Sequence, residues 1–495
     1  MRLRSRQRAD FDFHFRGVGR LPGVHTMSRM DSNTTDDGHP RVAQELLDRV
    51  LDHLHRDSES LKQCALASRS LLPTCQRHLF STYKISESNA SELVELFTPP
   101  ASTDEDDENA TLRPRVADLF NTYTNHLILT DHPVPALRSV LRVKYKLPEF
   151  KNVEKITFKG DELSWAIDIP SFLMQTWTSP SSKIRSVELD FRFMTQRSVL
   201  ESLCTLPGAV EDVSFISPRP KSTNPKPTAT SIRRNMEVLR EVPNVLNGTL
   251  KLRLPSETSE RLLPIMFELG DFFEFNLKRI DYRLTLYANV PDLASLVDKC
   301  KNTLEYLYIL VSFPSAYRMQ SQTSHPRSPN TAADKIPYLV LRRWSWGTEG
   351  PGSLDFSHHR ALRSIRIWTP AAFDPDWLSE AISSIPKPSN ATPRVPPLRI
   401  GLHISLPQWM MYPEDSGLHT SKDIDGLVAS WVPVDTQLSR LVGFSPDSAA
   451  SVTDGTTAGI LLDITIPELT TGPGKGVAAL LFPRLSDIKG LVRLV

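Results

Sequence analysis

Apolar residues recur with a helical period in residues 40–80, PRVAQELLDRVLDHLHRDSESLKQCALASRSLLPTCQRHLF. In the first part of this segment they are three and four positions apart, which places them on one face of an amphipathic helix. These residues are Val42, Leu46, Leu47, Val50, Leu51 and Leu54. The charged residues Glu45, Asp48, Arg49 and Asp52 fall mostly on the other face, so the pattern predicts a first short helix.

Two more short helices are expected from cap and proline signals. Ser60 with Gln63 fits a capping box, which predicts the start of a second helix. A third helix is expected from Leu72, because Pro73 is tolerated in a first turn. The residues expected to point inward are Leu61, Cys64 and Leu66 from the second helix and Leu72, Cys75 and Leu79 from the third. Three such helices bury too little surface to be stable alone, so this segment is expected to need a partner.

The same segment resembles an F-box, and more closely the F-box of a large family of proteins in mushroom-forming fungi. The pattern of that family runs roughly LPxELxDxIxDHLHxDxxSLxxCSLVCRSWLPxxRxHLF. The matching residues are Glu45, Leu46, Asp48, Asp52, His53, Leu54, His55, Asp57, Ser60, Leu61, Cys64, Leu66, Arg69, Ser70, Leu72, Pro73, Arg77, His78, Leu79 and Phe80. Two departures from the pattern matter: Val42-Ala43 replaces the leading Leu-Pro pair, and Leu71 replaces the Trp.

This resemblance implies a modular function. An F-box docks on a Skp1-like protein, which binds a cullin, and the remainder of the chain selects a protein substrate for ubiquitin transfer. The chain would then be the substrate receptor of an SCF-type ubiquitin ligase. It would need no catalytic residue, metal or cofactor, because it would contribute only proximity and orientation. The residues that the resemblance assigns to Skp1 binding are Val42, Glu45, Leu46, Val50, Leu54, Leu71, Leu72 and Pro73.

A second pattern recurs beyond this segment: apolar, two variable, apolar, one variable, apolar. It occurs at Val153-Ile156-Phe158, Ile184-Val187-Leu189, Val210-Val213-Phe215, Leu277-Ile280-Tyr282, Leu304-Leu307-Ile309 and Leu362-Ile365-Ile367. The first positions of these sets are 31, 26, 67, 27 and 58 residues apart. The longest interval divides near Leu250, and the interval of 58 leaves room for a unit at residues 338–341. The unit length lies at or just above the period of leucine-rich repeats.

Helical patterns lie between these predicted strands. The clearest covers residues 291–302, and another, with Val199, Leu200, Leu203 and Leu206, precedes Val210. Strands that alternate with helices at a short period imply parallel strands stacked side by side. The predicted fold class is therefore α/β: a short all-α F-box of three helices, followed by an irregular leucine-rich-repeat-like βα solenoid. It is called irregular because no Asn closes each unit at a fixed offset.

Residues that alternate with the buried strand positions are expected to face outward and to form a substrate-binding surface. Mixed charge beside aromatic side chains is typical of protein-recognition surfaces. The residues assigned to substrate binding are Lys155, Lys159, Glu188, Asp190, Arg279, Arg283, Tyr306, Tyr308, Arg366 and Trp368, with Thr157, Ser186 and Asp281 on the same face. An ordinary solvated strand face remains the alternative for any single one of them.

The predicted domain organisation has five parts. Residues 1–38 form a disordered basic leader, 39–82 the F-box, 83–124 a linker with an acidic loop, 125–410 the solenoid, and 411–495 a C-terminal extension or terminal repeats. An organelle or nuclear signal is the alternative for the leader, which has seven Arg and two Asp in its first thirty residues. Segments 98–114, 217–231, 312–337 and 385–397 lack periodic apolar residues and are interpreted as mobile loops.

Composition and motifs narrow the function class. A formal net charge of +1 disfavours a dedicated nucleic-acid binder, and no apolar run is long enough to cross a bilayer. Cys64, Cys75, Cys204 and Cys300 lack metal-ligand spacing and are interpreted as buried thiols of a cytoplasmic or nuclear protein. Residues 472–476, GPGKG, lack the spacing of a phosphate loop and are interpreted as a turn before a final strand or helix.

Two functions of different classes remain open. The first is the ligase receptor, with a Skp1-like protein, an indirectly bound cullin and an unknown protein substrate as partners, and no nucleic acid or membrane. The second is a non-catalytic repeat scaffold outside ubiquitin ligases, in which the three helices only cap the solenoid. An enzyme in the C-terminal region has little support, because neither a hydrolase elbow nor a zinc-protease motif occurs.

Overall fold

The computed structural model describes most of the expected elements and leaves gaps between them. It describes residues 43–86, 89, 118–130, 152–162, 183–206, 210–220, 228, 230–231, 233, 244–255, 258, 262–270, 272–284, 290–312, 354–371, 375–386, 397–406, 421–442, 460–466, 477–485 and 492–494. The expected basic leader, the acidic loop and most of the other expected mobile loops lie outside these residues.

The three N-terminal helices are present as α1 (Gln44–His53), α2 (Ser58–Ala67) and α3 (Leu72–Phe80). The expected start of the second helix at Ser60 is wrong. The helix begins two residues earlier because the Asp57 carboxylate accepts a hydrogen bond from the backbone N–H of Ser60 at 3.1 Å and caps it. Pro73 lies in the first turn of α3, as expected.

These helices enclose a small core of their own. Leu51, Leu61 and Cys75 are buried, and Leu54, Cys64, Ala65, Leu71 and Leu79 pack against them. The expected inward direction of Leu66 is wrong, because its side chain is 76% exposed. Leu72 is also exposed. The core is therefore smaller than the sequence pattern indicates.

Helices α1 and α3 run parallel. The amide of Gln44 donates to the carbonyl of Ser70, the Thr74 hydroxyl donates to Asp48 at 2.7 Å, and His78 Nε2 lies 2.9 Å from Asp52 Oδ1. Each pair is 26 residues apart, so both helices advance together in the same direction. Asp48 and Asp52 thus mark the side of α1 that faces α3.

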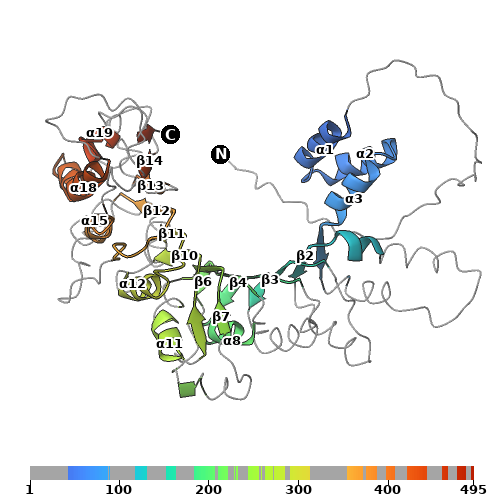
Figure 1. Cartoon of the computed structure of the whole chain (residues 1–495), viewed down its shortest axis with the longest axis horizontal. Coiled ribbons are helices and arrows are strands. Elements are labelled where there is room, and N and C mark those ends of the chain that lie inside the picture. Colours follow the sequence, from blue (N-terminus) through green and yellow to red (C-terminus); the bar gives the residue numbers. More distant parts are fainter. Residues whose placement is uncertain are drawn as a thin grey trace, which may run out of the picture.

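A large sheet follows, in which every pairing is parallel. Its strands follow one another along an arc (Figure 1). In spatial order they are β1 (Thr82–Ile85), β2 (His126–Thr130), β3 (Lys155–Glu162), β4 (Ser186–Met194), β5 (Asp212–Ile216), β8 (Thr249–Arg253), β10 (Arg279–Leu284), β11 (Tyr306–Val311), β12 (Ser364–Pro370), β13 (Leu398–Ser405), β14 (Ile460–Ile466) and β15 (Val492–Leu494), with β6 (Arg219–Pro220) beside β4. The architecture is α/β and is consistent with leucine-rich-repeat-like βα units.

All six sets of the repeated sequence pattern end in strands of this sheet, and the unit expected near Leu250 is β8. The further unit suggested at residues 338–341 does not form a strand between β11 and β12, because these two strands pair directly with each other. Residues 338–341 themselves lie outside the described part. The sheet also reaches beyond the predicted solenoid. It begins with β1 in the segment expected to be a linker, and β14 and β15 continue it in residues 411–495.

Helices pack on one side of the sheet, along the outer side of the arc (Figure 1). They are α8 (Gln196–Thr205), α11 (Leu262–Glu268), α12 (Val290–Lys299), α15 (Asp376–Ser383), α18 (Ser421–Leu441) and α19 (Val477–Leu481). The expected helices before Val210 and at residues 291–302 are thus confirmed as α8 and α12. A separate pair of short strands, β7 (Asn244–Leu246) and β9 (Phe273–Phe275), is also parallel. Apolar residues of the strands and helices form one continuous core.

A backbone ladder holds successive units in register despite their irregular sequences. The carbonyl of Ser81 accepts hydrogen bonds from the backbone N–H groups of Asn125 and His126. The same two-donor arrangement recurs one unit after another at the carbonyls of Asn125, Glu154, Arg185, Gly248, Lys278 and Glu305. Because backbone groups make these bonds, the stack needs no particular side chain at this point. This explains why no Asn is visible at a fixed offset.

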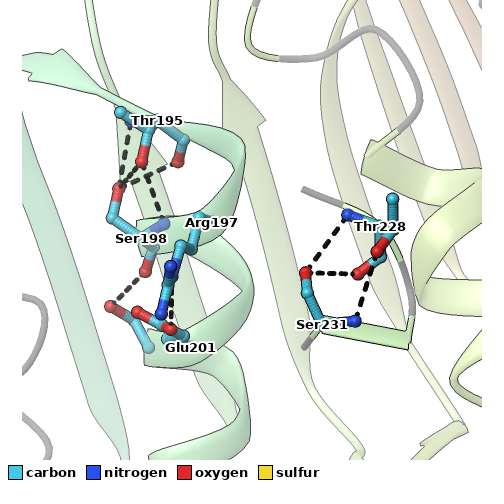
Figure 2. Close-up of polar contacts among 7 residues, drawn as sticks. Thr195, Arg197, Ser198, Glu201, Thr228 and Ser231 are labelled. Carbon is cyan, nitrogen blue, oxygen red and sulfur yellow. Dashed lines mark hydrogen bonds and ion pairs between the residues drawn. The ribbon is translucent and has the colours of Figure 1, made fainter. Parts of the chain in front are cut away.

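Two threonines cap helical turns through reciprocal hydrogen bonds (Figure 2). Thr195 Oγ1 accepts from the N–H of Ser198 at 3.1 Å, and Ser198 Oγ accepts from the N–H of Thr195 at 3.0 Å, at the start of α8. Thr228 and Ser231 make the same pair of bonds, both at 3.2 Å. This turn and β6 lie within residues 217–231, the segment that was expected to be a mobile loop.

Candidate protein-binding surfaces

The residues assigned to Skp1 binding separate into two groups in the structure. Leu46, Val50 and Leu72 are 54%, 57% and 36% exposed, and Glu45 and Pro73 are exposed beside them in sequence. Leu54 and Leu71, by contrast, are half-buried against the small core. Val42 lies outside the described residues. Fewer apolar residues are therefore exposed here than were assigned to Skp1 binding.

Leu46 and Val50 lie on the side of α1 that points away from α3. They are four residues apart and share one side of the helix. Each is two positions from Asp48, which contacts α3. Two residues correspond to a rotation of about 200° around the helix axis, so both side chains lie nearly opposite Asp48. The two side chains therefore form an apolar step on the outer surface of α1, which nothing among the described residues covers.

Hydrogen bonds fix the polar side of the helical module. The hydroxyl of Thr74 and the amide of Gln44 donate to Asp48 and hold the pKa of its carboxyl below the usual value. The side chain and backbone of Ser60 do the same for Asp57. Asp52 binds Arg77 at 3.1 Å and His78 at 2.9 Å. The relative placement of α1 and α3 is thus set by polar contacts as well as by the three buried residues.

All ten residues assigned to substrate binding lie on one face of the sheet, at strand positions that alternate with buried ones. Strand register aligns them in rows across the sheet, for example Glu188, Tyr308 and Arg366 in one row. Thr157 and Asp281, which were expected to face outward with them, are only 1% and 4% exposed. The face is therefore partly closed by neighbouring side chains.

Between β3 and β10, three acidic side chains of this face pair with cations. Lys155 binds Glu188 at 2.9 Å, Lys159 lies 3.5 Å from Asp190, and Arg253 makes two hydrogen bonds with Asp281 at 2.9 and 3.2 Å. Burial alone would raise the pKa of Glu188, but the hydrogen bond and charge of Lys155 outweigh it and lower that pKa. This half of the face is a network of internal ion pairs.

Between β11 and β14 the face is hollowed. The hollow has a volume of about 510 Å³. Its lining includes the predicted Tyr308, Arg366 and Trp368, and it also includes residues that the sequence interpretation missed: Arg399, Gly401, His403, Leu461, Asp463 and Thr465. The strict alternation of Leu398, Ile400, Leu402 and Ile404 was the available signal for this strand.

Other kinds of site find no support within the described residues. No group of three or more His, Cys, Asp or Glu side chains is placed to hold a metal ion, and no helix there is long and apolar enough to cross a membrane. Cys75 and Cys300 are buried free thiols and Cys64 is half-buried, while the side chain of Cys204 lies outside what is described. Burial raises the pKa of Cys300 to about 11, so this thiol is unreactive.

Comparison of the chain with protein-family models, with curated proteins and with solved structures finds no match. A function for the chain is therefore inferred from its residues and their geometry.

Proposed function

We propose that the chain is the substrate-receptor subunit of an SCF-type ubiquitin ligase, docking a Skp1-like protein through α1–α3 and a protein substrate on the sheet. The observation that carries the proposal is the exposed apolar step of Leu46 and Val50 on a three-helix module with its own small core. Such a module gains stability by covering that surface with a partner. The F-box-like sequence indicates which partner.

The position of the three-helix module is compatible with binding two different proteins, one on the helices and one on the sheet. The three helices stand beyond one end of the arc, next to β1 and β2 (Figure 1). A partner on the outer surface of α1 would leave the hollowed face between β11 and β14 accessible. The chain would then hold two proteins at separate places, and it would contribute proximity rather than chemistry.

Binding to a purified fungal Skp1 tests the proposal. We expect the full-length wild-type chain to bind it, and the variant L46D/V50D to bind at least about tenfold more weakly, because two carboxylates would be buried at the interface. The matched control is V432D/L480D, which changes two exposed apolar helical residues, 41% and 47% exposed, in α18 and α19. If the folded wild-type chain does not bind, or if both double variants bind equally, the proposal is wrong.

The scaffold alternative is favoured by the close junction between α3 and the sheet. The carbonyls of Phe80 and Ser81 accept hydrogen bonds from Thr124, Asn125 and His126, and the Phe120 ring packs edge-on against Phe80 and Tyr83. A cap that only protects the sheet would make such contacts. If the three-helix module acts only as a cap, removing residues 1–79 should destabilise β1 and β2, and the intact chain should not bind Skp1.

A further inference from the structure

Gly401 lies at the centre of the hollow between β11 and β14. Its register partners on the neighbouring strands are Arg366 of β12 and Asp463 of β14. Arg399 and His403 are two residues before and after it on β13, so their side chains point to the same face. A residue without a side chain is thus surrounded by four polar ones. Glycine inside a strand often marks a place where a ligand approaches the backbone closely.

Two arginines in this ring are exposed and lack an ion-pair partner among the described residues. Among the residues that the structure describes, neither Arg366 nor Arg399 forms an ion pair or a side-chain hydrogen bond, although both side chains are exposed. Their Cα atoms are diagonal neighbours on adjacent parallel strands, about 8 Å apart from strand spacing and rise. Two long guanidinium arms at this separation can converge on one anionic group.

Aromatic rings form the walls of the hollow, and neighbouring side chains hold them in place. The Arg253 guanidinium lies 5.5 Å from the ring centroid of Tyr308 and is itself bound to the buried Asp281. The rings of Trp368 and His403 are 4.0 Å apart, and Trp368 is 42% exposed. Because these walls are already ordered, a ligand would lose less affinity to their immobilisation.

We propose that the hollow around Gly401 binds an acidic peptide segment. A carboxylate of the peptide lies between Arg366 and Arg399, and an adjacent apolar side chain packs between Tyr308 and Trp368. The ring has two arginines and one aspartate, so its net charge is modest and Asp463 repels a polyphosphate chain. This favours a peptide over a nucleic acid. That the peptide belongs to a ligase substrate rests on the proposed function, whereas its binding does not.

Selection from a random dodecapeptide display library on the full-length protein tests this inference without assuming a sequence. We expect the recovered peptides to be enriched in Asp or Glu next to an aromatic or aliphatic residue. A synthetic copy of the leading peptide, with its Asp and Glu replaced by Asn and Gln, should bind at least about tenfold more weakly. Recovery of peptides without acidic enrichment would overturn the inference.

Three variants then locate the site. R366Q and R399Q should each lower the affinity for the leading peptide about tenfold. G401V should abolish peptide binding although it keeps both arginines, because the valine side chain fills the floor of the hollow. Valine suits a strand, so G401V is expected to fold, which circular dichroism checks. R197Q on α8 removes the same charge far away and should have no effect. The inference is wrong if the leading peptide binds G401V and R366Q as tightly as it binds the wild type. It is also wrong if a single-stranded RNA binds the wild type as tightly as the peptide does and G401V leaves that binding unchanged. Skp1 binding is read separately, so either proposal can fail alone.

Discussion

Two glycines show how the same residue type can have different roles. A Cβ on Gly248 would lie 2.4 Å from the carbonyl oxygen of Glu211, whereas at Gly401 the nearest atom would be Cγ of the flexible Arg366 side chain, at 3.3 Å. The Glu211 carbonyl accepts a ladder bond from Thr249, so it cannot move aside freely. We expect G248A to lower the free energy of unfolding by about 2 kcal/mol. G401A should change it by less than about 0.5 kcal/mol. Urea denaturation measures both, and equal losses would contradict this assignment.

His126 is expected to make stability depend on pH. Burial, and next the charge of Lys155, lower its pKa to about 4, while Glu188 opposes the shift. In the unfolded chain the histidine takes up a proton near pH 6.5, so lowering the pH from there to about 4 favours unfolding. We expect a loss of about 1.5 kcal/mol over this window, less than the full shift implies, because the side chain is only half-buried and solvent screens it.

The substitution H126Q isolates the pH effect of this histidine. Glutamine retains a group that can bond the Thr157 hydroxyl, which lies 2.9 Å from His126 Nε2, but it does not titrate. The stability of H126Q should therefore fall less steeply between pH 6.5 and 4 than that of the wild type, as measured by urea denaturation. An ordinary pKa near 6.5 in an NMR titration of the His126 ring would show that the prediction is wrong.

At the scale of a single element, the start of α8 permits a comparison between a cap and a surface ion pair (Figure 2). T195A removes the hydroxyl that accepts from the Ser198 N–H, and we expect a loss of about 1 kcal/mol. R197A breaks only the exposed pair with Glu201, at 2.8 Å, which is worth about 0.3 kcal/mol. T195S should restore most of the loss in thermal unfolding. A larger effect of R197A than of T195A would refute this ranking.

Strands were predicted where the repeated apolar pattern marks alternating burial, whereas β13 and β14 were missed although their burial alternates as well. The set Leu304-Leu307-Ile309 indicated β11, because its inward residues are fully buried by the helices behind the sheet. Cap chemistry was less predictable, since Asp57 and Ser60 both carry acceptors and only the fold decides which one meets a free N–H. Only some of the residues that line the hollow were predicted. Arg366 and Trp368 followed from strand alternation, but the role of Gly401 depends on its neighbours across three strands.

At the scale of the whole molecule, stability is expected to be uneven. The helical module depends on three buried residues, while the sheet and its outer helices share one continuous core. Free energy from burial grows with the apolar area removed from water, so α1 and α2 should open far more often than the sheet. The junction at Ser81 belongs to the backbone ladder and should stay closed with β1 and β2.

Hydrogen exchange measured by mass spectrometry tests this difference. In the isolated full-length chain, we expect peptides from α1 and α2 to exchange at least about 100-fold faster than peptides from β10, β11 and β12. Adding the purified fungal Skp1 should slow exchange in α1 and α2 and leave the sheet unchanged, because a partner that binds only the folded module stabilises it by mass action. The L46D/V50D variant serves as the control, since its helices should gain little protection from the same addition. If α1 and α2 are protected as strongly as the sheet before any partner is added, the helical module is an integral part of the sheet domain. That result would support the scaffold alternative and weaken the receptor proposal.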